Sequence, residues 1–199
     1  MSVLHQKKEK KRNSLLEAAH ELFLERGQEA TSVDSIVERA RMAKGTFYLY
    51  FKNKDALLSE VIYRLGRNVV LEAAAAEDVR AEQDFVEKLL LLLLLLEHVI
   101  EHFKENPAEL RMMEKNFSWS LIREKLQSAE EDAPLLEKLN AWVQSPCLAK
   151  YSREESLRIL YAIFEMFGSL CYSCIIEHQP VDIDEMKGTL FLLIRKMLA

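Results

Sequence analysis

The sequence predicts an all-helical protein, and three observations carry that prediction. Its 199 residues include only 5 Gly and 4 Pro, while 49% of them are hydrophobic. No segment shows the sustained alternation of apolar and polar residues that is typical of a half-buried strand. Apolar residues instead recur three and four positions apart over long stretches, as in amphipathic helices. We therefore expect an N-terminal three-helix domain (residues 1–54) and a larger helical domain (residues 55–199) that together bury a sizeable core.

The chain begins with a basic segment. Its first dozen residues carry Lys7, Lys8, Lys10, Lys11 and Arg12 against a single acid, Glu9. Two interpretations remain open, a disordered solubilising tail and an arm that contacts phosphate groups. No apolar stretch with a small-residue cleavage site is visible at this end, so we expect a cytoplasmic protein.

Charge divides unevenly along the sequence. The formal net charge is -5, yet residues 1–60 hold 11 Lys and Arg against 9 Asp and Glu, which leaves -7 for residues 61–199. An acidic segment binds nucleic acid poorly because phosphate repels it. Any contact with nucleic acid is therefore expected in the N-terminal part.

The next helix is expected to begin near Ser32. Thr31 with Asp34 three residues later matches a capping box, in which a hydroxyl accepts from an orphan amide and an acidic side chain reaches back. Apolar residues at helical spacing then predict a helix that packs inward and ends near Arg41, before a turn of about three residues.

A second short helix is expected over about residues 43–51. Phe47 and Phe51 lie four positions apart and can face the core together. Five basic residues and no acid lie between Arg39 and Lys54, a pattern typical of phosphate contact. The opposite face then presents groups that can reach a DNA groove: Lys44, Gly45, Thr46, Tyr48 and Tyr50.

Residues 15–58 resemble the DNA-binding domain of the tetracycline-repressor (TetR) family of bacterial transcription regulators. The matching segments are AAHELFLERG (18–27), TSVDSIVERA (31–40) and KGTFYLYFKNKDALL (44–58). The resemblance implies a ligand-released repressor that binds an inverted-repeat operator in double-stranded DNA as a homodimer. Carried over position by position, it implies DNA contacts by Thr31, Ser32, Lys44, Gly45, Thr46, Tyr48, Leu49, Tyr50 and Lys54.

Two residues depart from the family pattern. Arg41 stands where the family usually has Gly, at a left-handed position that costs other residues about 1 kcal/mol. Ala43 stands where the family often has Ser or Thr, and a missing helix cap costs roughly 0.5–2 kcal/mol. Either residue can instead contact DNA, Arg41 at a phosphate and Ala43 through its methyl group at a thymine.

Residues typical of helix starts and helix ends predict the bounds of the remaining helices. A long helix is expected over 55–76, and another over 82–105 that ends before Pro107. Shorter helices are expected over 108–118 and 134–143. Capping-box patterns at Ser152 with Glu155 and at Asp182 with Glu185 predict a helix to about residue 178 and a last helix over 183–198.

The second of these long helices contains eight consecutive leucines, Leu89 to Leu96, between Lys88 and Glu97. Roughly 20 apolar residues are needed to span a membrane, so this run is too short for one. A helix that is apolar all round is typical of a buried position. We expect no membrane contact and a buried central helix of the second domain that touches neighbours on several sides.

The last two long helices carry more apolar surface than a solvent-facing pair needs. They either complete the core of one chain or form a subunit interface. The TetR resemblance implies a four-helix bundle of two helices from each partner, and one helix-turn-helix unit covers only half of a two-fold operator. The expected interface residues are Leu157, Leu160, Tyr161, Phe164, Leu190, Phe191, Ile194 and Met197.

A site for an unknown small-molecule effector is expected in the second domain. The resemblance implies that the candidate residues lie in the region of the family's effector pocket, and methionines and aromatics suit an adaptable apolar cavity. The same residues would equally form ordinary core. The candidates are Phe103, Met112, Met113, Phe117, Trp119, Trp142, Phe164, Phe167 and Cys171.

Two patterns suggest other chemistry. His98, Glu101 and His102 fit H-x-x-E-H, the pattern of inverted zinc peptidases, so a metal-dependent hydrolase or a metal sensor is an alternative. Cys171 and Cys174 are neighbours on one helical face and could act as a redox sensor. In the plainer interpretation, which we adopt, the first group ends a leucine-rich helix and the cysteines are buried apolar residues. We assign no catalytic residue, metal or cofactor, and a sequence-independent nucleoid-type DNA binder is a further alternative.

Overall fold

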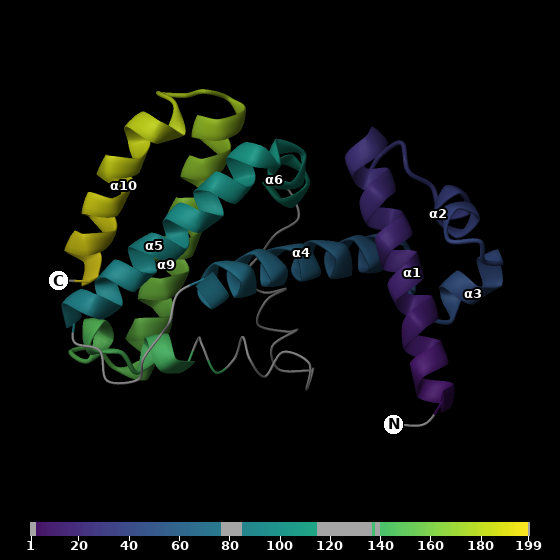
Figure 1. The fold of residues 1–199 in the computed structure, drawn as a ribbon, viewed down its shortest axis with the longest axis horizontal. Coiled ribbons are helices and arrows are strands. Elements are labelled where there is room, and N and C mark those ends of the chain that lie inside the picture. Colours follow the sequence, from purple (N-terminus) through teal and green to yellow (C-terminus); the bar gives the residue numbers. More distant parts are fainter. Residues whose placement is uncertain (1–2, 77–84, 115–136, 138–139, 199) are drawn as a thin grey trace.

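The computed structural model describes residues 3–76, 85–114, 137 and 140–198, and every regular element in these ranges is helical. The helices before residue 50 gather at one end of the molecule, those from residue 85 onward gather at the other, and a long helix runs between the two groups (Figure 1). The predicted all-helical class is therefore confirmed. The helices are α1 (Val3–Arg26), α2 (Val33–Arg39), α3 (Lys44–Tyr48), α4 (Lys54–Ala76), α5 (Phe85–Glu105), α6 (Pro107–Glu114), the short 3₁₀ helix η2 (Pro146–Leu148), α9 (Arg153–Ile176) and α10 (Ile183–Leu198).

Helix α2 begins where expected but with a different cap. Ser32 is the N-cap, and its hydroxyl exchanges hydrogen bonds with Ser35 in a capping box. The predicted pairing of Thr31 with Asp34 was wrong. Thr31 is instead buried, and its hydroxyl donates to the carbonyl oxygens of Gly27 at 2.7 Å and Leu22 at 3.3 Å. This side chain ties the α1–α2 connection together.

The turn between α2 and α3 has the left-handed residue that the sequence suggested. Helix α2 ends at Ala40, and Arg41 has φ 55°. Ala43 is the N-cap of α3 and makes no side-chain cap, as expected of alanine. Phe47 is fully buried and Phe51 is 5% exposed, so the predicted inward face of α3 is confirmed.

Replacing Arg41 with Gly is expected to raise the free energy of unfolding by about 1 kcal/mol, because glycine adopts a positive φ without a Cβ clash. Chemical denaturation of the two proteins measures this. Arg41→Lys is the control, since it keeps the charge and the strain and should leave the stability unchanged. An equal gain in both variants would show that the backbone strain is not the cause.

Helix α4 connects the two ends of the molecule (Figure 1). Asn53 caps it by accepting a hydrogen bond from the Ala56 amide at 2.8 Å. The helix packs against α1 near its start and against α5 further along, while α6 contacts α1, α4, α5 and α9. Helix α6 therefore lies at the junction of the two groups of helices.

Helix α5 contacts α4, α6, η2 and α9, as expected of a central helix with neighbours on several sides, but one face of its leucine run is exposed. Leu92, Leu93 and Leu96 are buried, whereas Leu90 and Leu94 are 53% and 40% exposed. A run of identical apolar residues carries no pattern that tells the inner face from the outer one. The predicted end of this helix before Pro107 is confirmed.

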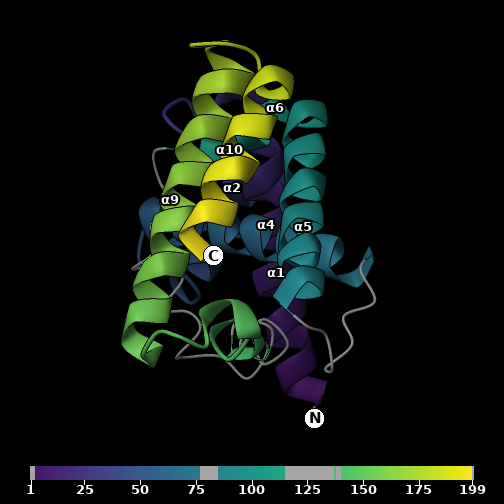
Figure 2. The same cartoon turned by 90° about the vertical axis from the view of Figure 1, so that its left-hand side faces the viewer.

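Helices α5, α9 and α10 lie side by side at the far end from α1 (Figure 2). The predicted capping box at Ser152 and Glu155 is confirmed, and the hydrogen bond from Ser152 lowers the pKa of Glu155. The last helix spans the predicted residues. The carboxylate of Asp182, the residue that was predicted to cap this helix, lies 2.6 Å from the Nδ1 atom of His178.

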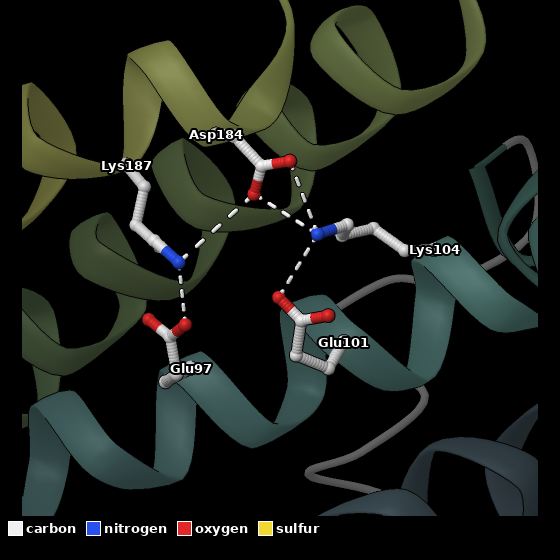
Figure 3. A network of polar contacts seen from close by, with 5 residues as sticks. All are labelled: Glu97, Glu101, Lys104, Asp184 and Lys187. Carbon is white, nitrogen blue, oxygen red and sulfur yellow. Dashed lines mark hydrogen bonds and ion pairs between the residues drawn. The ribbon is translucent and has the colours of Figure 1, made fainter.

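A polar network joins α5 to α10 (Figure 3). Lys104 Nζ lies 2.9 Å from Asp184 Oδ1 and 3.1 Å from Glu101 Oε1, and Lys187 contacts Glu97. The hydrogen bond from Lys104 lowers the pKa of Asp184, and the bond to Asp184 raises the pKa of Lys104. These ion pairs hold the start of α10 against the second half of α5.

Candidate nucleic-acid interface

The outward face of α3 carries large side chains that the fold leaves exposed. Tyr48 is 54% exposed and Leu49, directly after the helix, is 77% exposed. The ring of Tyr48 meets Phe47 edge-on at 5.2 Å, which fixes its base against the core. The predicted contact residues divide by position: Arg41, Ala43, Lys44 and Gly45 are exposed with this pair, whereas Thr46 and Tyr50 are half-buried.

Gly45 has no packing reason to be glycine. A Cβ added to this residue would have nothing within 4 Å, and its φ is not in the left-handed region. Glycine is also a poor helix former. Its presence on the exposed face of α3 is what close approach to another backbone, such as that of DNA, would favour.

We expect Gly45→Ala to change the folding stability and the DNA affinity in opposite directions. The free energy of unfolding should rise by about 0.5–1 kcal/mol because alanine favours the helix. DNA affinity should fall by about tenfold, or 1.4 kcal/mol, because the new methyl group separates the two surfaces. Denaturation and a DNA titration measure the two effects. Unchanged affinity would mean that nothing approaches Gly45 closely.

Two cations beside this face are already paired with carboxylates. Arg39 contacts Glu21 at 2.9 Å and Glu25 at 2.8 Å, and its hydrogen bond lowers the pKa of Glu25. Lys44 lies 2.8 Å from Asp34, whose hydrogen bond raises the pKa of Lys44. Sequence reasoning missed these pairs, since they join residues ten or more positions apart. The basic stripe is therefore less positive than its composition suggests.

The remaining predicted DNA-binding residues lie at the starts of α2 and α4. Ser32 is exposed at the α2 N-cap, whereas Thr31 is 1% exposed and its hydroxyl is turned inward. The Lys54 ammonium is half-buried and donates to the carbonyl oxygens of Gln28 at 2.8 Å and Thr31 at 3.0 Å. In this structure Lys54 holds the α1–α2 connection against α4.

Residues 15–61 match the family model of the bacterial regulatory proteins of the tetR family, and this segment runs from α1 through the whole helix-turn-helix into α4. Over 93% of its length the chain is 23% identical to the helix-turn-helix transcriptional regulator YhgD of Bacillus subtilis, covering 95% of that protein. It also superposes on a tetR-family regulator from Shewanella with a TM-score of 0.62 at 17% identity, covering 92% of this chain and 95% of that one. The chain belongs to the TetR family.

Two further similarities concern fatty-acid regulators. The chain is 35% identical over 80 residues, 40% of each chain, to the fatty acid metabolism regulator protein of Bacillus subtilis. The crystal structure of FadR from Bacillus subtilis in complex with stearoyl-CoA superposes with a TM-score of 0.58 at 18% identity, covering 91% of this chain and 96% of that one. This TetR-family chain is accordingly a helix-turn-helix DNA-binding transcription regulator, and the family's fold extends over 92% of it.

The candidate effector residues of this TetR-family chain are mostly core. Phe103, Met112, Met113, Phe167 and Cys171, from α5, α6 and α9, are all less than 10% exposed and belong to the hydrophobic core cluster that the described helices share. Trp142 and Phe164 are half-buried. Phe117 and Trp119 lie outside the described residues.

The predicted interface residues on α9 and α10 fall into two groups. Tyr161 is 41% exposed, and Leu157, Leu160, Phe164, Phe191 and Met197 are half-buried. Leu190 and Ile194 are fully buried within the chain, so they offer no surface to a partner. The exposed apolar residues of α10 are Leu192 at 50% and Leu193 at 41%, which sequence reasoning missed. On α10 the most exposed apolar positions are therefore 192 and 193, while positions 190 and 194 face the core.

The H-x-x-E-H residues are turned to separate partners. His98 is exposed, Glu101 contacts Lys104, and His102 Nε2 lies 2.8 Å from Glu109 Oε2. Within the described ranges, no three or more His, Cys, Asp and Glu side chains are grouped to hold a metal ion. The alternatives of a hydrolase and a metal sensor thus gain no support from the geometry of these residues.

Cys171 and Cys174 are buried on α9, and burial raises the pKa of Cys171 to about 12 and that of Cys174 in the same direction. A thiol with a raised pKa is protonated near neutrality and reacts slowly, since the thiolate is the nucleophile. We expect alkylation of these cysteines by iodoacetamide at pH 8 only after unfolding in urea. Labelling of Cys171 in the native protein, seen by mass spectrometry, would instead favour a redox role.

Proposed function

We propose that this chain binds an inverted-repeat operator as a homodimer, represses transcription, and is released by a small apolar effector held in residues 55–199. The observation that carries the proposal is the outward face of α3, where Tyr48 and Leu49 are exposed and where Gly45 has no packing reason to be glycine. Exposed large apolar side chains on a short helix favour a partner surface. Residues 1–54 then form the DNA-binding domain.

The apolar face of α9 and α10 supports the homodimer. Over residues 153–175 the mean hydropathy reaches 1.3, enough by length and composition to cross a membrane, yet only 22% of that stretch is buried within one chain. A Cβ added to Gly168 on α9 or to Gly188 on α10 would have nothing within 4 Å, so a neighbouring helix has room to approach at both positions. A second copy would cover this face and place two α3 helices on successive major grooves, about 34–36 Å apart.

Helix α6 supports coupling between the effector region and the DNA-binding domain. Its Glu109 contacts His102 of α5 at 2.8 Å, and its other carboxylate oxygen lies 3.7 Å from His20 Nε2 of α1. Met112 and Met113 of the same helix line the hydrophobic cluster. A ligand that displaces these methionines would move α6 against α1 and shift the population toward a dimer whose recognition helices no longer fit the operator.

The first effector to test is a long-chain acyl-CoA. FadR from Bacillus subtilis was solved with stearoyl-CoA, and this chain shares that protein's fold. Buried methionines and aromatics, such as those that α5, α6 and α9 contribute to the core cluster, suit an acyl chain. The acyl effector is therefore supported by the fold and by the composition of this cluster.

A DNA-binding titration tests the proposed function. We expect the purified protein to bind a duplex carrying the palindrome upstream of its own gene more tightly than a scrambled duplex, and a reporter behind that palindrome to be repressed. Stearoyl-CoA should weaken the specific complex, with free coenzyme A as the control. Equal affinity for both duplexes would favour the nucleoid-type alternative. Specific binding that stearoyl-CoA does not weaken would refute the acyl effector but leave the operator binding in place.

A further inference from the structure

The basic segment at the start of the chain is helical. Helix α1 begins at Val3, so of the two open interpretations the disordered tail does not hold for the described residues. Four lysines of its first turns, Lys7, Lys8, Lys10 and Lys11, are exposed. They extend past α3 at the N-terminal end of α1 (Figure 1).

Arg12 anchors this segment beside the recognition helix. Its guanidinium lies 2.9 Å from Glu60 of α4 and 5.6 Å from the centre of the Phe51 ring, just after α3. Asn13, the next residue, accepts a hydrogen bond from Arg64 of α4 at 2.8 Å. Because a helix rises about 1.5 Å per residue, Lys7 is only about 8 Å along the axis from Arg12.

These lysines differ in their pairing from three of the five cations between Arg39 and Lys54. Arg39 and Lys44 are bound to carboxylates, and Lys54 donates to backbone carbonyls. None of the four α1 lysines forms an ion pair with an acidic group among the described residues. They are therefore uncompensated positive charge held at a fixed place beside α3, in a chain of net charge -5.

We propose that Lys7, Lys8, Lys10 and Lys11 form a second DNA-binding surface, which contacts the phosphates that flank the base pairs facing α3. The inference rests on the proposed function and adds to it a sequence-independent contact outside the operator core. Phosphates are the expected partner because lysine ammonium groups suit phosphate oxygens and carry no base specificity.

The expected size of the effect follows from counterion release. Each phosphate neutralised adds about 0.9 to the slope of log affinity against log salt. A dimer carries two copies of the segment, so removing Lys7 and Lys11, which share one helical face, removes four charges. The slope should fall by roughly 2–4, and affinity near physiological salt by at least about tenfold.

The test compares Lys7→Gln with Lys11→Gln against a control of equal charge, Lys150→Gln with Arg158→Gln. Lys150 lies before α9 and Arg158 in α9, at the far end of the molecule from α1 (Figure 1), and neither is among the expected interface residues. Affinity is measured from about 50 to 300 mM salt. Each protein is titrated with a duplex that ends at the palindrome and with one extended by flanking sequence on both sides. Glu9→Gln is a third variant, which should tighten binding to the extended duplex.

We expect the Lys7 and Lys11 variant to lose affinity and salt slope on the extended duplex, to match wild type on the trimmed one, and to keep its preference for the palindrome. The control pair should behave as wild type on both. An unchanged slope on the extended duplex, or an equal loss in the control pair, would overturn the proposal. Failure of the wild type to prefer the palindrome would instead refute the proposed operator binding, since the slope difference is measurable on any sequence.

Discussion

Glutamates in place of both Leu192 and Leu193 are expected to convert the dimer into monomers. These side chains are 50% and 41% exposed on α10 and supply the outward apolar surface of that helix in the described part of the chain. A two-fold interface meets itself, so the double variant places four carboxylates in one buried patch, where unpaired charges are costly. Sedimentation or light scattering measures the change in mass.

Loss of the dimer should weaken operator binding by about 10² to 10⁴-fold. The second half-site of a dimer binds at a high effective concentration, and a monomer loses that gain entirely. Affinity for an isolated half-site should stay the same, because the α3 face is untouched. Val86→Glu with Leu90→Glu on α5 is the matched control, as these residues are similarly exposed. If only the control pair became monomeric, the interface would lie on α5 instead.

Much of the fold could be predicted because local signals determine it. Capping residues and the proline after Asn106 set helix ends within a few residues, and Phe47 with Phe51 identified the inner face of α3. The positive φ of Arg41 followed from a single position in the motif. These features depend on neighbours along the chain, which a sequence displays directly.

The polar contacts of the site could not be predicted because they depend on tertiary packing. Nothing local indicates that Glu25 pairs with Arg39 across α1 and α2, or that Lys54 bonds to the carbonyls of Gln28 and Thr31. Counting charges identified the basic segment. It could not show that Arg39 and Lys44 are paired with carboxylates and that Lys54 donates to backbone carbonyls. The sequence likewise could not choose between Leu190 and Leu192 as outward positions, since both are apolar at helical spacing.

Removing the two large exposed side chains of the recognition face, by Tyr48→Ala with Leu49→Ala, is expected to abolish specific binding. Each good base or backbone contact contributes roughly 1–3 kcal/mol, so losing two per protomer should weaken the operator complex by more than about a hundredfold. Stability should change by less than about 0.5–1 kcal/mol, since neither residue is buried. Affinity for scrambled DNA should fall far less, because the lysines that attract phosphate remain.

Substitution of the neighbouring core residue Phe47 is expected to have the opposite effect, a loss of stability and not of recognition. Phe47 is fully buried between Tyr48 and Phe51, so Phe47→Ala should cost about 3–5 kcal/mol of stability through the cavity it leaves. Binding would then fall only in proportion to the unfolded fraction and would recover at low temperature. If the Tyr48 and Leu49 variant also lost stability, its binding defect would reflect misfolding of α3. Intact stability with lost discrimination would mean that α3 is the sequence-recognising surface of this regulator.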